Sequence, residues 1–566
     1  ATKGQLNTSS LPLRIGGNTI WGEYFSGLID EVRIYNRALE SAEIQAVMKL
    51  PITPHAPTRS SPIALDSYGR LLWVVNPDND SVSAIDADTL RLMFEVPVGQ
   101  HPTSIGVDRS GQVWVACRDD DSVWMLGADG SVRNILKLPW GAAPISVILT
   151  PDSTQGFVGL YGRGQIQKFD PITQVLGKTL TLGTTPKAMA ITADGKRLLV
   201  SQFISTDGSG TVRTVDLDSF AEGKALTLPL DSTTTDGSIA ARGLPNYLAG
   251  LAIDPSGGLA WAVGKKDNIL RGLFRDGKSL TFETTVRALL SPLDLNVNQE
   301  ITARRVDLDN LSQPSAITLN ETGTRLFVTL QGNNKLVVLN QLGREIARAE
   351  TGLAPQGIVI DYSTGRIFTQ DFMSRTVSVF DGTALLKQTG TSLPLLAQIR
   401  TIETEKLPLA VLRGKQIFYN AADIRMSRDG YLSCAVCHLD GEHDGQVWDF
   451  TDRGEGLRNT TSLRGQGGHA TVPFHWTGNF DEAQDFENDI RAAFGGFGFM
   501  SDADFSLGAR SQPLGDPKTG ISQELDDLAA YLDSLVASGR SPRRDGSGAL
   551  TNSAQAGSVL FENLGC

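Results

Sequence analysis

Five consecutive residues carry the clearest chemistry in this sequence: Cys434-Ala435-Val436-Cys437-His438. Two thiols at this spacing can both add to vinyl groups on one porphyrin edge, and the adjacent imidazole can then bind the iron. The pattern is specific, because the 566 residues include only 4 cysteines and 6 histidines. It predicts one complete site for covalently bound haem c, attached through Cys434 and Cys437 with His438 as an iron ligand.

Two other chemistries use closely spaced cysteines. A structural zinc site needs four ligands, often from two such pairs, and the sequence contains no second Cys-x-x-Cys. A thioredoxin-like dithiol belongs to a βαβ unit, and no such pattern surrounds residues 434–438. Haem attachment is therefore the preferred interpretation.

The second axial ligand of the iron decides between electron transfer and catalysis. A Met or His closes the coordination sphere, whereas an open position admits a substrate such as peroxide. Met500 lies 62 residues after His438 (500 − 438), in a Gly-rich loop that follows a predicted helix, and is the favoured ligand. His475 is the alternative and His469 a further candidate. His443 follows the motif too closely to reach the other face of a haem, so we expect it on the surface.

Several other side chains could serve the same site. Glu482 and Glu487 are candidate acid–base groups, although an acidic helix face is more often solvated. Arg458 and Arg464 could pair with haem propionates, with surface exposure as the simpler interpretation. Trp476 could stack on a porphyrin, but a packed aromatic is the commoner role. No residue is assigned a catalytic role from these patterns.

These side chains must be positioned by residues 408–538, which we expect to form an all-α haem domain. Residues 413–418 predict an opening helix, and residues 521–536 predict a closing helix with an apolar stripe at helical spacing. A third helix is predicted at 481–494 and should end at Gly495-Gly496.

Residues 58–405 carry an internal repeat in which each unit has a Pro, an alternating apolar strand, an Asp/Gly turn and a second strand. The marker prolines are Pro62, Pro102, Pro144, Pro186, Pro245, Pro314 and Pro355. Their separations of 40, 42, 42, 59, 69 and 41 residues (by subtraction) predict a seven-bladed β-propeller. The two long separations predict insertions at 206–243 and 270–306, as loops on one face. We expect the propeller to be a docking platform or a substrate-facing scaffold.

The units of this repeat resemble YVTN-type propeller repeats. The segment from Gly414 onward resembles the bacterial di-haem cytochrome c peroxidase family, through the haem motif, RNTTSL at 458–463, PFHWTG at 473–478 and SPRRDG at 541–546. The family reduces peroxide by passing electrons through one haem to a second, and some relatives oxidise protein side chains or cleave organic substrates. Thr477 stands where the family usually has Asp, so the family's catalytic roles are not carried over. In cytochrome c folds the first and last helices cross and pack, so the resemblance implies contact between the helices predicted at 413–418 and 521–536, and Gly414 would permit their close approach.

Both ends of the sequence predict parts of further domains. Residues 1–50 contain the strand-like LIDEVRIY at 28–35 and resemble the C-terminal end of a laminin-G/concanavalin-like sandwich. One strand cannot bury a sandwich, so we expect the rest of that domain upstream. In residues 539–566, GSVLF at 557–561 repeats GKQIF at 414–418, and Cys566 follows. We expect Cys566 to be the first cysteine of a second haem site in the full-length protein.

Composition restricts the partners and the location. The net charge is −12 (51 − 63) without a basic run, so no nucleic-acid partner is expected. No apolar stretch approaches the roughly 18 residues of a membrane span. Cys117 is expected to be a buried small residue. Because bacteria attach haem to thiols outside the cytoplasm, we expect a periplasmic, extracellular or cell-surface location.

The expected fold class is a multidomain protein, mainly β, with a seven-bladed propeller, a partial β-sandwich and an all-α cytochrome c domain. The preferred function is an exported c-type cytochrome that transfers electrons with a redox partner protein. One alternative is a di-haem peroxidase or oxidase whose propeller presents the substrate. Another is an adhesion module whose sandwich or propeller binds a carbohydrate or protein ligand.

Overall fold

The structure is a computed structural model, and it describes residues 17, 22, 24, 58–66, 70–183, 185–206, 208–467 and 473–565. The chain divides into two compact units, Ala1–Pro54 and His55–Cys566. Within the first unit the description is limited to an antiparallel bridge between Gly17 and Tyr24. The strand predicted at 28–35, His469 and Cys566 lie outside the described residues.

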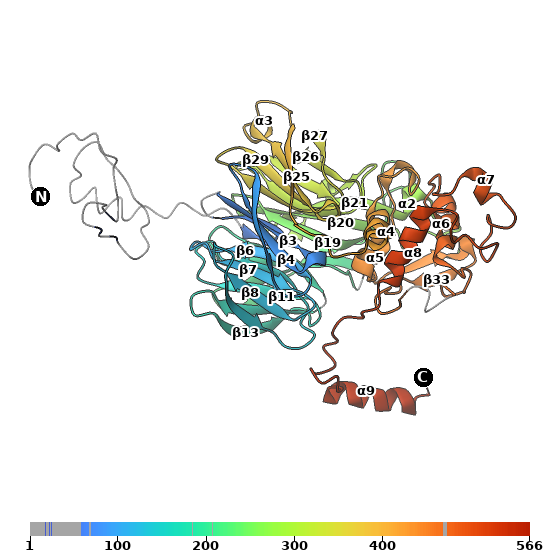
Figure 1. The fold of residues 1–566 in the computed structure, drawn as a ribbon, viewed down its shortest axis with the longest axis horizontal. Helices are drawn as coiled ribbons and strands as arrows, with labels where there is room; N and C mark the ends of the chain where they lie inside the picture. The colour runs from blue at the N-terminus through green and yellow to red at the C-terminus, as the bar shows by residue number, and fades with distance from the viewer. Residues whose placement is uncertain are drawn as a thin grey trace, which may run out of the picture. The chain divides into compact units, whose positions relative to one another are not determined.

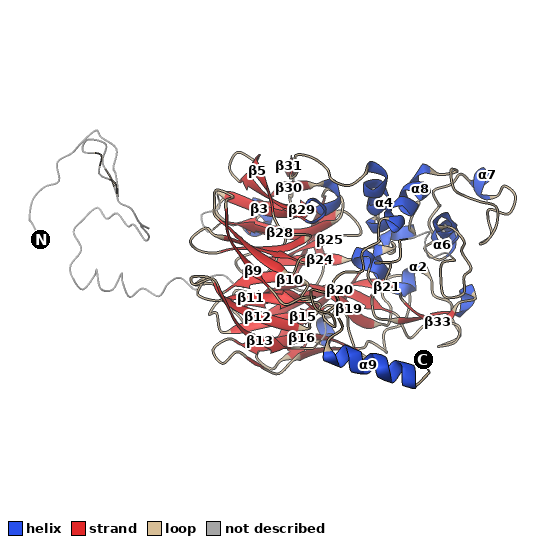
Figure 2. Ribbon diagram, turned by 60° about the horizontal axis from the view of Figure 1, so that its bottom comes forward, coloured by secondary structure: helices blue, strands red, loops and turns tan. Residues whose placement is uncertain are grey.

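Seven antiparallel sheets follow one another along the second unit, and Figure 2 shows their strands packed side by side. They confirm the predicted seven-bladed β-propeller, and the described structure is mainly β. Blade one consists of β2 (Ile63–Leu65), β3 (Leu71–Asn76), β4 (Ser81–Asp86) and β5 (Arg91–Pro97). Blade two consists of β6 (Pro102–Val107), β7 (Val113–Cys117), β8 (Ser122–Leu126) and β9 (Val132–Lys137). Blade three consists of β10 (Pro144–Leu149), β11 (Gly156–Leu160), β12 (Gln165–Asp170) and β13 (Val175–Thr181).

The two insertions predicted from the repeat lie in the next two blades. Blades four and five consist of β14 (Pro186–Ile191), β15 (Arg197–Gln202), β16 (Ser209–Asp216), β17 (Ala221–Glu222) and β18 (Leu226–Pro229); β19 (Leu244–Ile253), β20 (Leu259–Asp267), β21 (Val286–Asp294), β22 (Gln299–Glu300) and β23 (Val306–Leu308). The prediction of simple loops is therefore wrong, because these residues include a divided fourth strand in each sheet, β17 and β18 on β16 and β22 and β23 on β21. They also form α2 (Phe282–Thr285) and η2 (Thr302–Arg304).

The last two blades keep the basic four-stranded pattern. They consist of β24 (Pro314–Leu319), β25 (Arg325–Leu330), β26 (Lys335–Asn340) and β27 (Glu345–Glu350); β28 (Pro355–Asp361), β29 (Arg366–Asp371), β30 (Thr376–Asp381) and β31 (Leu395–Arg400). The short helices between propeller strands are η1 (Pro77–Asn79), η3 (Phe372–Ser374) and α3 (Thr383–Leu386).

The marker prolines lie at or beside the start of the first strand of each blade, where a missing backbone N–H costs no ladder hydrogen bond. The ring closes by side-chain packing: Ile63 and Val74 of blade one share a buried cluster with Phe368 of blade seven. A further short strand, β1 (Thr58–Arg59), pairs with the end of β14 through Thr58↔Ile191 and Arg59↔Ala190.

The segment that follows the propeller contains most of the helices. Its elements are α4 (Leu409–Tyr419), η4 (Arg428–Gly430), α5 (Ala435–His438), η5 (Leu439–Gly441), β32 (Val447–Phe450), η6 (Thr451–Arg453), β33 (Gly456–Asn459), η8 (Ala483–Asp485), α6 (Phe486–Ala492), α7 (Asp502–Phe505), α8 (Gln523–Asp533) and α9 (Asn552–Asn563). The expectation of helices alone is met in part, because β32 and β33 form a two-stranded antiparallel sheet.

Helices α4 and α8 pack against each other, as predicted for the opening and closing helices. Gly414 permits the contact, because a Cβ atom at this position would lie 1.8 Å from the backbone oxygen of Asp527. The helix predicted at 481–494 appears as η8 followed by α6. Figure 1 shows α4, α5 and α8 beside the long strands β20 and β21 of blade five.

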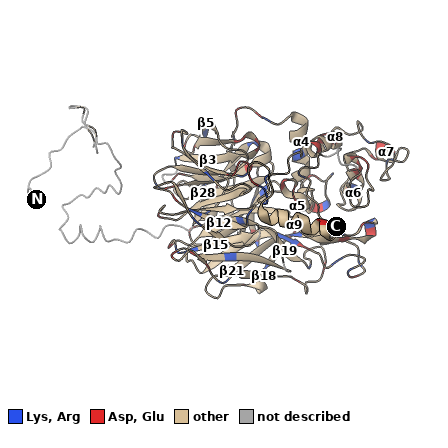
Figure 3. Ribbon diagram, turned by 90° about the horizontal axis from the view of Figure 1, so that it is seen from below, with Lys and Arg blue, Asp and Glu red and all other residues tan. Residues whose placement is uncertain are grey.

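In the view of Figure 3, positions of Lys and Arg and positions of Asp and Glu are both scattered along the ribbon. Among the helices that the structure describes, none is long and apolar enough to cross a membrane.

Candidate functional site

The Cys-x-x-Cys-His motif forms a single helical turn. Cys434 precedes α5, and its carbonyl oxygen accepts hydrogen bonds from the backbone N–H groups of Cys437 (3.3 Å) and His438 (3.0 Å). The turn brings both thiols and the imidazole to one cavity, because Cys434, Cys437 and His438 all line it. We call this space the motif cavity.

The motif cavity has a volume of about 480 Å³, within the usual range for a cofactor pocket. Aromatic and aliphatic side chains from α4, β32, α6 and α8 dominate its wall. They include Phe418, Trp448, Phe450, Phe486, Ile490, Phe494, Leu528 and Leu532. A large apolar wall of this kind suits a flat, hydrophobic ring system.

His438 is held in one orientation and one protonation state. Its Nδ1 lies 3.2 Å from the carbonyl oxygen of Glu442. A carbonyl only accepts hydrogen bonds, so this contact requires the proton on Nδ1 and leaves the Nε2 lone pair free. Burial lowers the pKa of His438 below its ordinary value. A neutral imidazole fixed through Nδ1 is the usual arrangement of a metal-binding histidine.

The two motif thiols are stabilised in their neutral form. Burial, reinforced by the charge of Asp489, raises the pKa of Cys434 to about 12. Burial and the nearby Asp444 likewise raise the pKa of Cys437. Reactive dithiols and thiolate metal ligands instead need a lowered pKa. In the described part of the chain no group of three or more His, Cys, Asp or Glu side chains is placed to hold a metal ion.

A second histidine reaches the motif cavity from the loop after β33. The Nδ1 of His475 lies 2.8 Å from Oδ1 of Asn479 and 3.6 Å from Oε1 of Glu455. Both oxygens are acceptors when Glu455 is ionised, so the ring again carries its proton on Nδ1 and has a free Nε2. His438 and His475 therefore line the same cavity, and in each ring a contact at Nδ1 leaves Nε2 unprotonated.

Met500, the favoured second ligand, lies elsewhere. It is not among the described residues that line the motif cavity, and its side chain is buried with Met426, Ile490 and Leu525. Its backbone N–H donates a hydrogen bond of 3.1 Å to Oε1 of Glu487. Cys434 touches the same cluster, so Met500 lies behind one wall of the cavity.

The two candidate acid–base glutamates have structural contacts. Glu487 is fully buried, pairs with Arg491 at 2.7 Å and accepts from the backbone N–H of Phe499 at 2.9 Å. The expectation that its helix face is solvated is therefore wrong for Glu487. Glu482 accepts hydrogen bonds from the backbone N–H groups of Lys518 and Thr519, which ties the chain before α8 to η8.

The remaining candidates divide between the cavity and other contacts. Arg458 lines the motif cavity, and its Nε lies 3.7 Å from a carboxylate oxygen of Glu455. Arg464 instead pairs with Glu442 at 3.2 Å. Trp476 also lines the cavity, but its side chain is 58% exposed rather than packed. His443 is exposed, as expected.

The propeller supports the motif directly, which the sequence did not reveal. The hydroxyl of Tyr247 donates a hydrogen bond of 3.0 Å to the carbonyl oxygen of Cys437. Lys265 pairs with Asp444 at 3.1 Å and with Asp267 at 3.0 Å, and all three side chains are at most 1% exposed. Asn246 donates to the carbonyl oxygen of Asp444 at 2.9 Å.

This charged network is asymmetric, because one ammonium group serves two carboxylates. Burial, together with the charge of Asp444, raises the pKa of Asp267 to about 6 despite the pairing with Lys265. Burial also acts to raise the pKa of Asp444, but Lys265 and hydrogen bonds outweigh it, so this pKa lies below the ordinary value. The indole N–H of Trp448, a cavity residue, donates to Oδ2 of Asp444 at 3.1 Å.

The insertion in blade five also packs against the Cys-x-x-Cys-His motif. Leu280 and Val286 share a buried cluster with Tyr431, Leu432 and Val436, against which Cys437 packs. The Asp449 carboxylate accepts from the backbone N–H groups of residues 274 and 275 at 2.8 and 2.9 Å. The motif is therefore enclosed by both segments of the second unit.

Comparisons with known proteins give partial likenesses. The chain is 25% identical over 189 residues to the uncharacterized protein YncE of Salmonella typhimurium and, equally, to that of Salmonella typhi, which is 32% of this chain and 51% of each relative. It thus spans about half the length of these curated relatives.

Among solved structures, hydrazine synthase of Kuenenia stuttgartiensis has 16% identity and a TM-score of 0.48, covering 57% of this chain and 96% of that one. A functionally unknown protein of Desulfotomaculum acetoxidans has 14% identity and a TM-score of 0.41, covering 59% and 96%. Residues 1–45 match the family described as the concanavalin A-like lectin/glucanases superfamily, which supports the laminin-G-like likeness at the N-terminus.

Proposed function

We propose that residues 408–538 form a c-type cytochrome domain that binds one haem covalently and transfers single electrons. In this proposal Cys434 and Cys437 would hold the haem through thioether links, and His438 and His475 would bind its iron. The observation that carries the proposal is that both cysteines and the histidine of the motif line one mainly apolar cavity of about 480 Å³. When bound, the haem supplies one-electron redox chemistry at its iron.

The residues around the cavity fit such a group. The neutral thiols are available for addition to vinyl groups, and the fixed Nδ1–H of His438 leaves Nε2 free for a metal. Arg453 and Arg458 line the wall, and the Nε of Arg458 lies 3.7 Å from a carboxylate oxygen of Glu455. Two guanidinium groups at a mainly apolar cavity suit the carboxylates of haem propionates.

We choose His475 over Met500 because His475 lines the motif cavity and because a contact at Nδ1 orients its ring. His475 lines the same space as His438 and has an Nδ1 contact to Asn479 that directs Nε2 as a free ligand. Met500 would have to leave a buried cluster and move past Ile490 and Phe494. Two histidine ligands close the coordination sphere, which favours electron transfer over substrate binding.

The axial ligands are tested on the full chain produced with c-type haem maturation. We expect a low-spin ferric spectrum in the wild type and in Met500→Ala, and a high-spin spectrum in His475→Ala. The Met500→Ala variant is the matched control, since it removes the other candidate ligand. Loss of the low-spin signal in Met500→Ala, with no change in His475→Ala, would overturn the assignment of His475.

A buried carboxylate supports a second candidate function, reduction of peroxide. Glu455 is 6% exposed, lines the motif cavity and lies beside His475. Paired in this way, His475 and Glu455 could accept and return a proton on a substrate in the cavity. Peroxide turnover by the wild type that disappears in Glu455→Gln would favour this function, and absence of turnover would favour electron transfer alone.

The location and partners extend the proposal. We propose a periplasmic, extracellular or cell-surface location for this protein, because attachment of haem to thiols takes place outside the bacterial cytoplasm. Single-electron transfer also requires a redox partner protein, and Trp476, which lines the motif cavity and is 58% exposed, offers it a surface aromatic. A carbohydrate or protein ligand of the N-terminal and propeller regions remains the alternative proposal for an adhesion role.

A further inference from the structure

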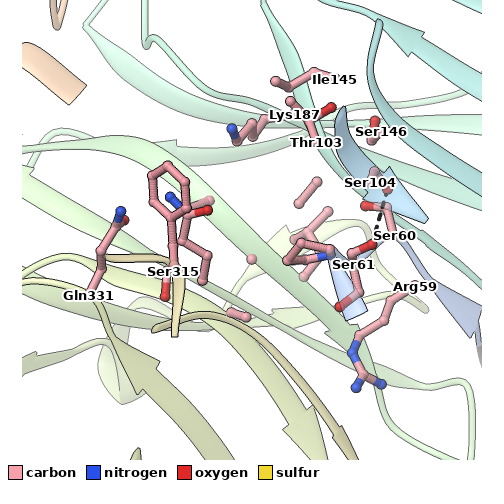
Figure 4. A pocket seen from close by; sticks show the side chains of 18 of the residues that line it. Arg59, Ser60, Ser61, Thr103, Ser104, Ile145, Ser146, Lys187, Ser315 and Gln331 are labelled. Carbon is pink, nitrogen blue, oxygen red and sulfur yellow. Dashed lines mark hydrogen bonds between the residues drawn. The ribbon is translucent and has the colours of Figure 1, made fainter. Parts of the chain in front are cut away.

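A separate cavity of about 100 Å³ lies in the centre of the propeller (Figure 4). Inner strands of several blades line it, including β6, β10 and β14. Near the end of β14 it is lined by Arg59, Ser60 and Ser61, because β1 pairs with Ala190 and Ile191 there. Leu439 and Asp440, which directly follow the Cys-x-x-Cys-His motif, also line it. We call this space the channel cavity.

The repeat supplies one residue of each blade at the same register, directly after the marker proline. These seven residues are Ile63, Thr103, Ile145, Lys187, Asn246, Ser315 and Gln356. Five of them line the channel cavity, namely Thr103, Ile145, Lys187, Ser315 and Gln356. Lys187 is the one charged residue in the set of seven, so a single ammonium group faces the centre of the propeller.

No carboxylate of the described structure lies within ion-pair distance of this ammonium group, although the charge of Asp440 acts on it from a greater distance. Lys187 has no hydrogen bond and no ion pair there, and its Nζ lies 5.3 Å from the centre of the Phe203 ring. Burial lowers the pKa of Lys187, as expected for a cation removed from water. The carboxylate of Asp440 lines the same cavity but lies beyond ion-pair distance and accepts the hydroxyl of Tyr419 at 2.6 Å.

Two further polar groups around the cavity are unsatisfied. The side-chain nitrogen of Gln331 and the hydroxyl of Ser146 are buried, with residue exposures of 4% and 2%, and neither has a hydrogen-bond partner among the described residues. Figure 4 shows both around the same space as Lys187. An ammonium and an amide nitrogen can only donate, and a hydroxyl can donate as well. A ligand that satisfies all three must accept hydrogen bonds.

We propose that the channel cavity binds a small planar monovalent oxyanion, either a monocarboxylate such as formate or a nitrogen oxyanion such as nitrate. One negative charge matches the ammonium group of Lys187, and several oxygen lone pairs match the three donors. The guanidinium of Arg59, which also lines the cavity, donates a hydrogen bond to the carbonyl oxygen of Ile358. A volume of about 100 Å³ equals roughly three water molecules, which is enough for one such ion with little accompanying solvent. The channel cavity and the motif cavity share no lining residue, so the proposed anion site is separate from the Cys-x-x-Cys-His motif.

The test is thermal unfolding of the full-length holoprotein with increasing sodium formate or sodium nitrate, using sodium chloride to keep the ionic strength constant. A ligand that binds the native state raises the melting temperature in a saturable manner. We expect a saturable rise with at least one of the two oxyanions in the wild type. The anion with the higher affinity identifies which of the two chemistries the site prefers.

Two variants make the test specific. Lys187→Met removes the cation and should lower the affinity at least tenfold, whereas Lys196→Met removes an exposed lysine of the same blade and should leave the response unchanged. Lys187→Arg retains the charge and should retain the response, which separates binding from folding if Lys187→Met unfolds. An equal response in Lys187→Met and wild type, or no saturable response to either anion in the wild type, would overturn the proposal.

Discussion

The hydroxyl of Tyr247, on the first strand of blade five, donates a hydrogen bond of 3.0 Å to the carbonyl oxygen of Cys437, 190 residues later in the chain. The Tyr247 ring also stacks on Phe203 at 4.2 Å and lies 4.3 Å below Lys265 Nζ. A propeller side chain therefore helps to fix the backbone of the Cys-x-x-Cys-His motif. The propeller is therefore a structural part of the candidate site. The sequence led us to expect only a docking platform or a substrate-facing scaffold.

Removing this hydroxyl tests the connection. Tyr247→Phe should lower the free energy of unfolding by about 1 kcal/mol, because the Cys437 carbonyl loses a buried donor. It should also perturb the absorption spectrum of the bound haem. Tyr362→Phe is a matched control, since its hydroxyl donates to the Leu319 carbonyl at 2.6 Å within the propeller. An unchanged haem spectrum in Tyr247→Phe would contradict a role at the motif.

Lys265 is predicted to be essential for the stability of this region. Lys265→Met leaves two buried carboxylates, Asp267 and Asp444, without their common cation. We expect a loss of about 3–5 kcal/mol in unfolding free energy, measured by denaturant titration. The control Lys335→Met breaks an ion pair with Glu350, whose side chain is 73% exposed, and should cost less than about 1 kcal/mol. Equal losses in the two variants would refute the prediction.

A buried carboxylate of blade seven predicts a pH effect on stability. Burial raises the pKa of Asp371 to about 6, above the ordinary value of 3.8, in spite of hydrogen bonds from Ser378 and Thr369. The native state therefore binds more protons than the unfolded state between about pH 4 and 6, and Asp371 lowers stability as the pH rises through this window. Asp371→Asn should reduce this slope by up to about 1.4 kcal/mol per pH unit.

The measurement is the unfolding free energy at several pH values between 4 and 7. Asp381→Asn, at the end of the next strand, is the control, because the pKa of Asp381 is lowered by hydrogen bonds from Thr383. Its removal should leave the slope of this window nearly unchanged. A slope that is identical in wild type and Asp371→Asn would show that Asp371 does not titrate there.

The crossing of α4 and α8 predicts opposite effects for two glycine substitutions. Gly414→Ala places a methyl group 1.8 Å from the Asp527 backbone oxygen and should destabilise the protein by about 1–3 kcal/mol or more. Gly557→Ala, in the exposed helix α9, has no neighbouring atom within 4 Å and should stabilise that helix by about 1 kcal/mol. Thermal unfolding and helical circular dichroism distinguish the two.

The seven blades and the α4–α8 contact could be predicted because local signals carry them. Each marker proline sets the start of an inner strand, and Gly414 marks a close backbone approach. The role of the insertions could not be predicted in this way. Only the separations of 59 and 69 residues indicated extra chain, and its packing onto Tyr431 and Val436 depends on contacts between distant segments.

The second axial candidate shows the same limit. Met500 has the spacing and the loop setting expected of an iron ligand. In the folded chain its side chain is buried with Met426, and its backbone N–H donates a hydrogen bond to Glu487. His475 reaches the motif cavity through a turn in which its own φ is 65°. Loop geometry of this kind follows from the tertiary structure. The pair Lys265 and Asp444, 179 residues apart, was similarly hidden in the sequence.

Intact-mass spectrometry of the full chain, matured in a host that attaches c-type haem, tests the central claim most directly. The account predicts a mass increase of one haem per chain that withstands denaturation and maps to the peptide containing residues 434–438. The double variant Cys434→Ala, Cys437→Ala should lack this increase, while Cys117→Ala should retain it. A wild-type chain that carries no covalent haem under these conditions would contradict the account.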